Sequence, residues 1–421
     1  MRIAVIGAGL PGISTACFLA KSGHEVLVLD RREGPGLETS FANGGMLTPS
    51  QAAPWNTPGI ALQLLKWIGR EDSPFLLKFS QLPALTGWGT AFLRHSGMSS
   101  FRRNQLKNAA LGLYSLQVLR ETRQQLGIQY DQSTCGTMKI YRSGYTLDTA
   151  LAMLKASDLT QLPYQVLDQA GVIGQEPALS PIRDKLAGGI YFPEDEAGDA
   201  YLYCRELAAA AVRFGASFMY GTELTGLVRD KNRISAVSTR QGDIEADLYI
   251  LAAGSFSPRL ARTAGLALPV YPVKGYSLTI PTSSLSATLP VLPVIDELRH
   301  VAVTPLGQRL RVAGKAELAG YDTSVNEHKV KLLLKFFGQI YPQVGSQVER
   351  DSVQVWSGLR PYTSDGVPIL GGCEIENLLL NTGHGHLGWT LAAGSASLIT
   401  DLICGKETAL DLAPYLLSRF H

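Results

Sequence analysis

The first thirty residues constrain the fold more than any other stretch of the chain. Residues 1–6 are a short apolar run rich in β-branched side chains, which is typical of a buried parallel strand. Glycine then occupies the first, third and sixth positions of residues 7–12, and a helical pattern follows over 13–22. A second buried strand over 25–29 ends at Asp30. This order predicts a strand–glycine loop–helix–strand unit.

Each part of this unit meets a requirement of dinucleotide binding. Gly7 permits a tight turn, Gly9 leaves room for a pyrophosphate, and Gly12 lets the helix pack closely on the strand. The helix N-terminus directs free N–H groups and a positive dipole end at the phosphates. Asp30 follows the loop at the distance where a carboxylate accepts hydrogen bonds from ribose hydroxyls. The unit predicts nucleotide binding but does not separate NAD from FAD.

Composition narrows the class of protein. The chain has 421 residues, which is longer than a domain with a single hydrophobic core usually is, so two domains are expected. A net charge of +2 without a long basic run argues against a nucleic-acid partner. The five cysteines are scattered and include no C-x-x-C pair, which favours reduced thiols in a cytoplasmic setting over disulfides or a metal site.

Prolines interrupt two long uncharged stretches, over 41–65 and 276–295, and no membrane-spanning helix is expected. No signal peptide is expected either, because the N-terminal apolar run is short and belongs to the nucleotide motif. The region over 55–93 is unusually apolar, and residues 60–92 within it, with Trp67 and Trp88, are predicted to be mostly helical but irregular. We expect this region to cover the substrate pocket, with contact to a membrane or partner as the alternative.

A second glycine-rich loop lies near the other end of the chain. A buried strand over 378–381 leads into residues 382–388, and a helix is predicted over 389–404. The strand over 246–251 also leads into a turn of small residues. A reduced flavin carries negative charge that the N-terminus of helix 389–404 would stabilise, whereas an NAD fold does not require this second loop. A glycine-rich helix cap is the alternative interpretation.

Taken together, these residues resemble the bacterial D-amino acid dehydrogenases of the FAD-dependent D-amino acid oxidase and glycine oxidase superfamily. The similarity spans nearly the whole chain. The chain departs from that pattern at Gly45-Met46-Leu47 and at His386. The segments that carry the resemblance are Gly7-x-Gly9-x-x-Gly12 with Asp30-Arg31, Glu38-Thr39-Ser40-x-Ala42-Asn43, Ala53-Pro54-Trp55, Lys274 to Pro281, Gly358-Leu359-Arg360-Pro361, Asp365-Gly366-x-Pro368, and Asn381 to Thr390.

The resemblance implies an α/β fold with a Rossmann-type FAD-binding domain assembled from distant segments and an inserted α+β substrate domain. Residues 1–60, 186–262 and 345–421 would form the first domain, and residues 61–185 and 263–344 the second. FAD would oxidise a D-amino acid to an imino acid, which hydrolyses to a 2-oxo acid and ammonia. Electrons would pass to a quinone or another respiratory-chain acceptor, and the protein would be cytoplasmic or peripheral on the inner face of the cell membrane.

The resemblance also assigns residues. Arg360 is expected to clamp the substrate carboxylate with its bidentate fork, with a structural ion pair as the alternative. Tyr276 is the second candidate, as a donor to the same carboxylate or simply as a packing residue. Neither His384 nor His386 is assigned as a base. The expected FAD-binding residues are Gly7, Gly9, Gly12, Asp30, Arg31, Thr39, Ser40, Asn43, Gly44, Ala253, Gly254, Gly383, His384, Gly385, Leu387 and Gly388.

Two other readings of the function stay open at this point. The same fold could serve an oxidase that uses oxygen, or a dehydrogenase of glycine, sarcosine or D-hydroxyproline. The chain could also be a flavoprotein subunit for binding or assembly, in which FAD is structural.

Overall fold

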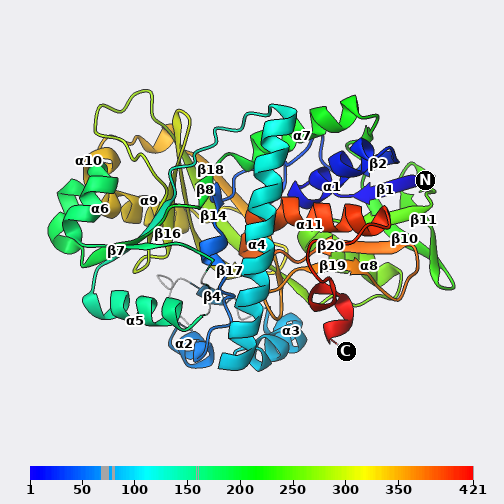
Figure 1. Cartoon of the computed structure of the whole chain (residues 1–421), viewed down its shortest axis with the longest axis horizontal. Helices are drawn as coiled ribbons and strands as arrows, with labels where there is room; N and C mark the ends of the chain where they lie inside the picture. Colours follow the sequence, from blue (N-terminus) through cyan, green and yellow to red (C-terminus); the bar gives the residue numbers. More distant parts are fainter. Residues whose placement is uncertain (68–74, 78–80, 158, 160, 421) are drawn as a thin grey trace.

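The computed structural model describes the chain except for residues 68–74, 78–80, 158, 160 and 421. Two large β-sheets occupy the two halves of the molecule, and the long helix α4 (Met98–Leu126) crosses in front of the boundary between them (Figure 1). Among the described residues, no helix is long and apolar enough to cross a membrane.

The first sheet has six strands in the order β19-β20-β13-β1-β2-β9. All neighbouring pairs are parallel except β19 with β20. The sheet therefore brings together the start, the middle and the end of the chain, and the predicted Rossmann-type fold from distant segments is confirmed. The strands are β1 (Arg2–Ile6), β2 (Glu25–Leu29), β9 (Ser217–Met219), β13 (Leu248–Leu251), β19 (Ile369–Gly372) and β20 (Leu378–Thr382).

Helices and a small sheet bury the two faces of this sheet. On one face lie α1 (Leu10–Lys21), α7 (Ala200–Arg213) and α11 (Gly388–Ile403), with α4 packed across α11. Small residues let α4 and α11 approach closely, because a Cβ on Gly394 would lie 2.8 Å from Ser115. On the other face lie α8 (Ser257–Thr263) and the antiparallel strands β10 (Leu224–Asp230), β11 (Arg233–Thr239) and β12 (Gly242–Ile244).

The second sheet has nine strands in the order β18-β14-β17-β16-β15-β5-β7-β6, with β4 paired to β17. Two hydrophobic clusters join this sheet to helices. The larger cluster includes residues of α6 (Gln169–Gln175), α9 (Glu327–Ile340) and α10 (Pro342–Gly345), and the smaller one includes residues of α5 (Gly144–Lys155). The strands of the sheet are β4 (Phe75–Leu77), β5 (Thr137–Tyr141), β6 (Gln165–Leu167), β7 (Gly188–Phe192), β14 (Val270–Pro281), β15 (Val294–Asp296), β16 (Val301–Leu306), β17 (Arg309–Leu318) and β18 (Gln354–Thr363).

The sheets do not divide the chain at the expected domain boundaries. Strands β7 and β18 lie in the nine-stranded sheet, although their residues were assigned to the FAD-binding domain. The division into domains therefore stays a prediction. In the apolar region, α2 (Ile60–Trp67) and α3 (Leu82–Arg94) are helical as expected, whereas β4 between them was not predicted. Residues 68–74 and 78–80 of that region lie outside the described residues.

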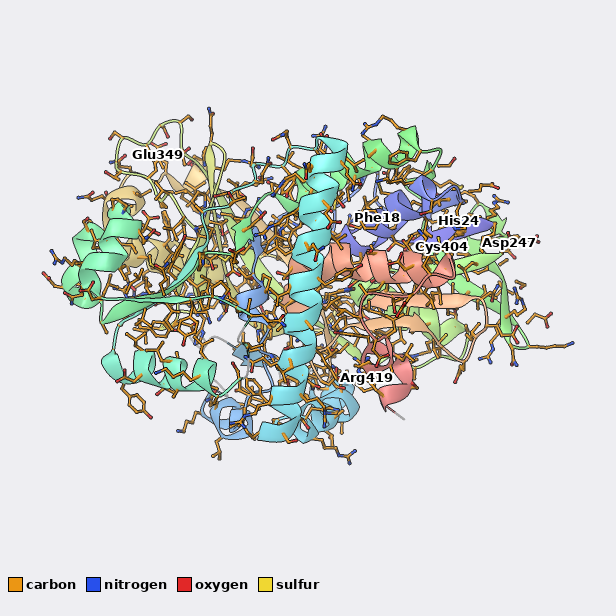
Figure 2. All side chains as sticks on the ribbon, viewed as in Figure 1. Phe18, His24, Asp247, Glu349, Cys404 and Arg419 are labelled. Atoms are coloured by element: carbon orange, nitrogen blue, oxygen red, sulfur yellow. The ribbon has the colours of Figure 1, made fainter. Side chains whose placement is uncertain are left out.

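Hydrogen bonds from the C-terminal segment stabilise the turn that follows β18. Arg419, labelled in Figure 2, donates from Nε and Nη2 to the buried carboxylate of Asp365 at 2.8 and 3.2 Å. It also donates to the carbonyl of Val367 at 2.7 Å. From the other side, Asn104 and Asn108 of α4 donate to the carbonyls of residues 365 and 366. The end of β18 is thereby held rigidly against α4.

Candidate active site

A cavity of about 910 Å³ lies between the two sheets, which is near the upper end of the usual range for ligand pockets of roughly 300–1,000 Å³. Most of the expected site residues line it, from segments far apart in the sequence. Gly12 and Gly383 do not line it. Those that do are Gly7, Gly9, Asp30, Arg31, Thr39, Ser40, Asn43, Gly44, Ala253, Gly254, Tyr276, Arg360, His384, Gly385, Leu387 and Gly388.

The three glycines of the first loop differ in what surrounds them. Gly7 has φ +110°, and a Cβ there would lie 2.6 Å from the carbonyl oxygen of Ala252. A Cβ on Gly12 would lie 1.9 Å from the carbonyl oxygen of Gly7, so this glycine allows the helix to approach the strand. A Cβ on Gly9 would meet only Ser40 Oγ, at 3.5 Å. Gly9 is thus the glycine whose missing side chain leaves space in the cavity, as a phosphate requires.

Asp30 and Arg31 lie at the end of β2, as expected. Asp30 accepts hydrogen bonds from the backbone N–H groups of Ala8 at 2.6 Å and Arg32 at 2.8 Å. Burial raises the pKa of Asp30, although these backbone bonds oppose the shift. The Arg31 guanidinium lies 3.7 Å from the ring centre of Phe256, which also lines the cavity. This end of the cavity combines a carboxylate with a flat aromatic and cationic surface.

The loop from Thr39 to Gly44 is fixed by hydrogen bonds to both halves of the molecule. The Thr39 hydroxyl donates to the carbonyl of Leu359 at 2.7 Å, and Ser40 Oγ accepts from the N–H of Leu10 in α1 at 3.1 Å. The carbonyl of Gly44 accepts from Thr304 at 2.7 Å. Its polar atoms are therefore held in place along the wall of the cavity.

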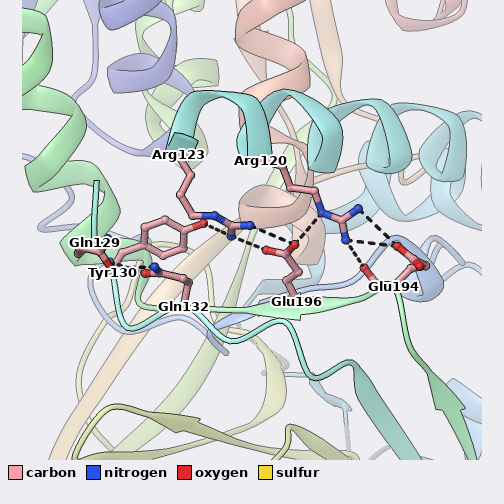
Figure 3. Close-up of polar contacts among 7 residues, drawn as sticks. All are labelled: Arg120, Arg123, Gln129, Tyr130, Gln132, Glu194 and Glu196. Carbon is pink, nitrogen blue, oxygen red and sulfur yellow. Dashed lines mark hydrogen bonds and ion pairs between the residues drawn. The ribbon is translucent and has the colours of Figure 1, made fainter. Parts of the chain in front are cut away.

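An acidic segment, residues 194–196, stabilises this loop. Leu47 of β3 (Met46–Leu47) pairs with Glu196 of β8 (Glu196–Ala197). The buried Glu196 carboxylate accepts from Arg120 Nε and Arg123 Nη1 of α4, each at 2.6 Å (Figure 3). Arg123 also donates to the Tyr130 hydroxyl at 2.9 Å. Helix α4 thus anchors β8 and, through β8, the loop that lines the cavity.

The C-terminal glycine loop enters the cavity from β20. Gly383 has φ +79°, and a Cβ there would lie 2.5 Å from Thr363 Cγ2, so this glycine serves the packing of the turn. The loop continues through a 3₁₀ turn over Gly385–Leu387 into α11. No N-cap side chain accepts from the backbone at the start of α11 or of α1. The N-terminus of α11 is therefore open to an anionic ligand, and α1 offers the positive end of its dipole although its first N–H donates to Ser40 Oγ.

The two histidines of this loop are neutral at physiological pH. His384 Nε2 lies 3.0 Å from the Ser395 hydroxyl of α11, and His386 Nε2 lies 3.3 Å from the carbonyl oxygen of Gln51. Burial lowers the pKa of His384 to about 3 and that of His386 to about 4. The His386 ring stacks on Trp55 with centroids 5.0 Å apart and planes 19° apart.

Arg360 of β18 reaches the cavity from the nine-stranded sheet. Its Nη1 donates to the carbonyl of Lys315 at 3.1 Å, and its guanidinium carbon lies 5.6 Å from the Trp55 ring centre. Burial lowers the pKa of Arg360 to about 10, so the group remains a cation at neutral pH. Across the part of the chain that the structure describes, no carboxylate lies within ion-pair distance of it. The alternative role of Arg360, a structural ion pair, therefore lacks a partner carboxylate among the described residues.

Tyr276 lines the cavity, but its hydroxyl is already engaged. It donates to Glu317 Oε2 at 2.9 Å, on the neighbouring strand β17. Burial and this bond raise the pKa of Tyr276, so the proton stays on the oxygen. The role of Tyr276 as a donor to a substrate carboxylate stays a prediction, and the structure gives that proton another acceptor.

Several cavity residues were not predicted as site residues. Gln51, Trp55 and Lys315 contact the expected residues, and Gly275 lies under Arg360. A further ion pair, Lys139 with Glu297 at 2.8 Å, lines the part of the cavity next to β15. Gly275 and Trp55 belong to the segments that carry the resemblance. Their contacts could not be predicted, because they depend on strand register and on the packing of loops.

Comparison with known proteins identifies the family of the chain. The family model described as FAD dependent oxidoreductase matches residues 2–402. A D-amino acid dehydrogenase of Granulibacter bethesdensis is 42% identical over 423 residues, covering 100% of both chains. A D-amino acid dehydrogenase of Paramagnetospirillum magneticum is 42% identical over 424 residues, covering 100% of this chain and 99% of the relative.

Solved structures share the whole fold. A glycine oxidase from Geobacillus kaustophilus has a TM-score of 0.76 at 26% identity, covering 99% of each chain. An L-proline dehydrogenase from P. horikoshii has a TM-score of 0.77 at 18% identity, covering 100% of this chain and 97% of that one, and shows the likeness of fold alone. The chain therefore belongs to the FAD dependent oxidoreductase family: it is an oxidoreductase, and its cofactor is FAD.

Proposed function

We propose that this oxidoreductase oxidises D-amino acids to 2-oxo acids and ammonia. The observation that carries the proposal is Arg360, a cation in the wall of the FAD cavity without an acid of the described residues to neutralise it. A substrate carboxylate would complete this pair. The relatives named D-amino acid dehydrogenase, similar over their full length, give the substrate class.

Arg360 would act by holding the substrate, not by chemistry of its own. A guanidinium has five N–H donors, and the carbonyl of Lys315 accepts from one nitrogen, which leaves donors for a bidentate grip on a carboxylate. The fork would restrict how the substrate lies in the cavity, which favours an orientation in which its α-carbon can face the cofactor. Bound FAD would accept the hydride from the α-carbon.

The residues that would hold the cofactor follow strands of the six-stranded sheet. Gly9 and the N-terminus of α1 would receive the pyrophosphate, and Asp30 the ribose. The open N-terminus of α11 would stabilise negative charge on the flavin, as would its backbone N–H groups. These assignments rest on the cavity lining and on the space at Gly9.

We further propose a lipophilic acceptor such as a quinone, reached from the membrane surface. Ile60, Leu64 and Phe92 of α2 and α3 line the cavity, which supports an apolar path at that side. The neighbouring outer surface combines exposed apolar and basic side chains, and the sequence has no Asp or Glu between residues 73 and 120. Such a surface is complementary to an anionic bilayer. Its residues are Leu62, Lys66, Leu93, Arg94, Met98, Arg102, Arg103 and Leu106.

The test is turnover of the purified holoenzyme on matched D- and L-amino acids. An artificial quinone should sustain formation of 2-oxo acid and ammonia from the D-enantiomers, and oxygen alone should sustain little. Exclusive use of L-enantiomers would refute the substrate class, and stoichiometric peroxide in air would refute the acceptor. For the membrane contact, co-sedimentation with anionic vesicles should exceed that with neutral vesicles and should fall in an R102E/R103E variant.

A further inference from the structure

His386 is held by one ring nitrogen, and its other nitrogen remains available. Nε2 lies 3.3 Å from the carbonyl oxygen of Gln51, which can only accept a hydrogen bond, so Nε2 carries the proton. In the neutral ring, Nδ1 then has a lone pair and no proton. No described residue bonds to Nδ1.

The free nitrogen is open to the cavity. His386 lines the cavity. Among the described residues, the fully buried side-chain atoms without a hydrogen-bond partner do not include His386 Nδ1, so this atom keeps some exposed surface. The two nitrogens point to different sides of an imidazole ring, so Nδ1 faces away from Gln51. Stacking on Trp55, with 19° between the planes, fixes the plane of the ring. An acceptor of defined direction therefore faces the cavity.

This acceptor stands beside Arg360. The Arg360 guanidinium carbon lies 5.6 Å and the His386 ring centre 5.0 Å from the centre of the same Trp55 ring. The positive charge of Arg360 acts on the His386 ring and helps to keep it neutral. A cationic fork next to a neutral acceptor matches the two groups of an α-amino acid, whose carboxylate and nitrogen share one carbon.

We propose that His386 Nδ1 accepts a hydrogen bond from the amino group of the substrate while Arg360 holds its carboxylate. The inference rests on the proposed function and adds the second point of attachment. Two attachments on neighbouring groups leave the substrate little freedom to rotate about the Arg360 fork. His386 thereby determines which face of the α-carbon is presented for oxidation.

His384, in the same loop, provides a contrast. Its ring is buried and lies 3.0 Å from Ser395 inside α11, and it does not take part in the aromatic stack of His386. We assign it to the packing of the loop, and it has no part in the amino-group contact.

A pair of substitutions separates the acceptor from the anchor. In His386→Gln the amide nitrogen takes the place of Nε2 and keeps the bond to Gln51, but nothing replaces Nδ1. In His386→Asn the amide takes the place of Nδ1 and offers an oxygen acceptor, but the bond to Gln51 is lost. Both variants are measured as holoenzymes at equal flavin content, with D-alanine as substrate and propionate, which lacks the amino group, as competitive inhibitor.

The proposal predicts that His386→Gln lowers kcat/KM for D-alanine by roughly 10–100-fold, as expected for the loss of one hydrogen bond to an ionisable group. His386→Asn should retain more activity than His386→Gln, and the inhibition constant of propionate should change by less than about twofold in both. Arg360→Lys is the control, because it should weaken propionate as well as D-alanine.

Three results would overturn the proposal: a His386→Gln variant as active as the parent, a His386→Asn variant less active than His386→Gln, or equal losses for D-alanine and propionate. The last two would make His386 an anchor of the loop. If the parent enzyme does not oxidise any D-amino acid, the proposed function fails before His386 is tested, so the two failures are distinguishable.

Discussion

The guanidinium of Arg360 lies directly against the backbone of Gly275. A Cβ on residue 275 would lie 2.3 Å from Arg360 Nη1 and 2.4 Å from its guanidinium carbon. The contact follows from strand register, because Gly275 of β14 pairs with Gly358 of β18, two residues before Arg360. The absence of a side chain at residue 275 is therefore what allows Arg360 to lie flat along the cavity wall.

The first prediction is that Gly275→Ala displaces the Arg360 fork. The added methyl must push the guanidinium aside, since the backbone of a central strand has little room to move. We expect kcat/KM for D-amino acids to fall about tenfold or more, with FAD content unchanged because residue 275 faces Arg360 and not the glycine loops. Steady-state kinetics measures the effect. Parental kinetics in Gly275→Ala would show that the position of Arg360 observed here is not the one used.

Removal of the guanidinium itself should have a larger effect. Arg360→Ala deletes two charge-assisted hydrogen bonds in a partly desolvated site, a loss on the order of 3–5 kcal/mol. We expect kcat/KM to fall roughly 10²–10³-fold, and Arg360→Lys to recover only part because an ammonium lacks the fork. The flavin spectrum should stay near that of the parent in both variants. Undiminished oxidation by Arg360→Ala would place the carboxylate clamp elsewhere.

The two glycine loops and their strands were predictable because they depend on local pattern. Buried β-branched runs that lead into glycine turns identify β1 and β20, and the helices after them follow from spacing. The partners of Tyr276 were not predictable. Its bond to Glu317 depends on the register of β14 against β17, which carries a shift between residues 274 and 276. No property of the sequence near Tyr276 specifies that register.

The contacts of His386 could not be predicted from the sequence for a related reason. Gln51 and Trp55 lie more than 300 residues earlier in the chain, and Tyr362 belongs to β18. They meet the His386 ring only because two loops fold over the end of β18. Strand β4 was missed because its three residues are apolar on their own and pair with β17 through the main chain. Short apolar runs do not distinguish strand from helix.

Gly9 gives a test of the cofactor site that leaves the fold intact. Its φ of −79° suits any residue, and a Cβ would meet only Ser40 Oγ at 3.5 Å, so a side chain there enters the cavity. Gly9→Val should therefore fold but bind FAD far more weakly than the parent. Titration of the apoprotein with FAD measures the change, and Gly9→Ala should show an intermediate loss. Parental affinity in Gly9→Val would mean that the phosphates lie elsewhere.

Asp195 should give stability a pH dependence in mildly acidic solution. It accepts hydrogen bonds from Ser50 Oγ at 2.5 Å and Thr137 Oγ1 at 2.6 Å, and burial raises its pKa from 3.8 to about 6. Between these values the folded chain holds a proton that the unfolded chain has lost, so stability falls as pH rises from about 4 to 6. The full effect is about 3 kcal/mol.

Asp195→Asn removes this titration, so the stability of the variant relative to the parent should increase across the same pH window and stay constant above it. Urea unfolding of both proteins at a series of pH values measures the difference. A difference independent of pH would show that the carboxyl of Asp195 titrates at its ordinary value.

Anaerobic mixing of the holoenzyme with single amino acids tests the central claim most directly. We predict that D-alanine bleaches the visible absorption of the flavin in the parent enzyme, that L-alanine does not, and that Arg360→Ala slows the bleaching by D-alanine roughly 10²-fold or more at subsaturating substrate. Dithionite serves as the control that the flavin is reducible in each sample. Flavin that dithionite reduces but that no D-amino acid reduces would contradict the account.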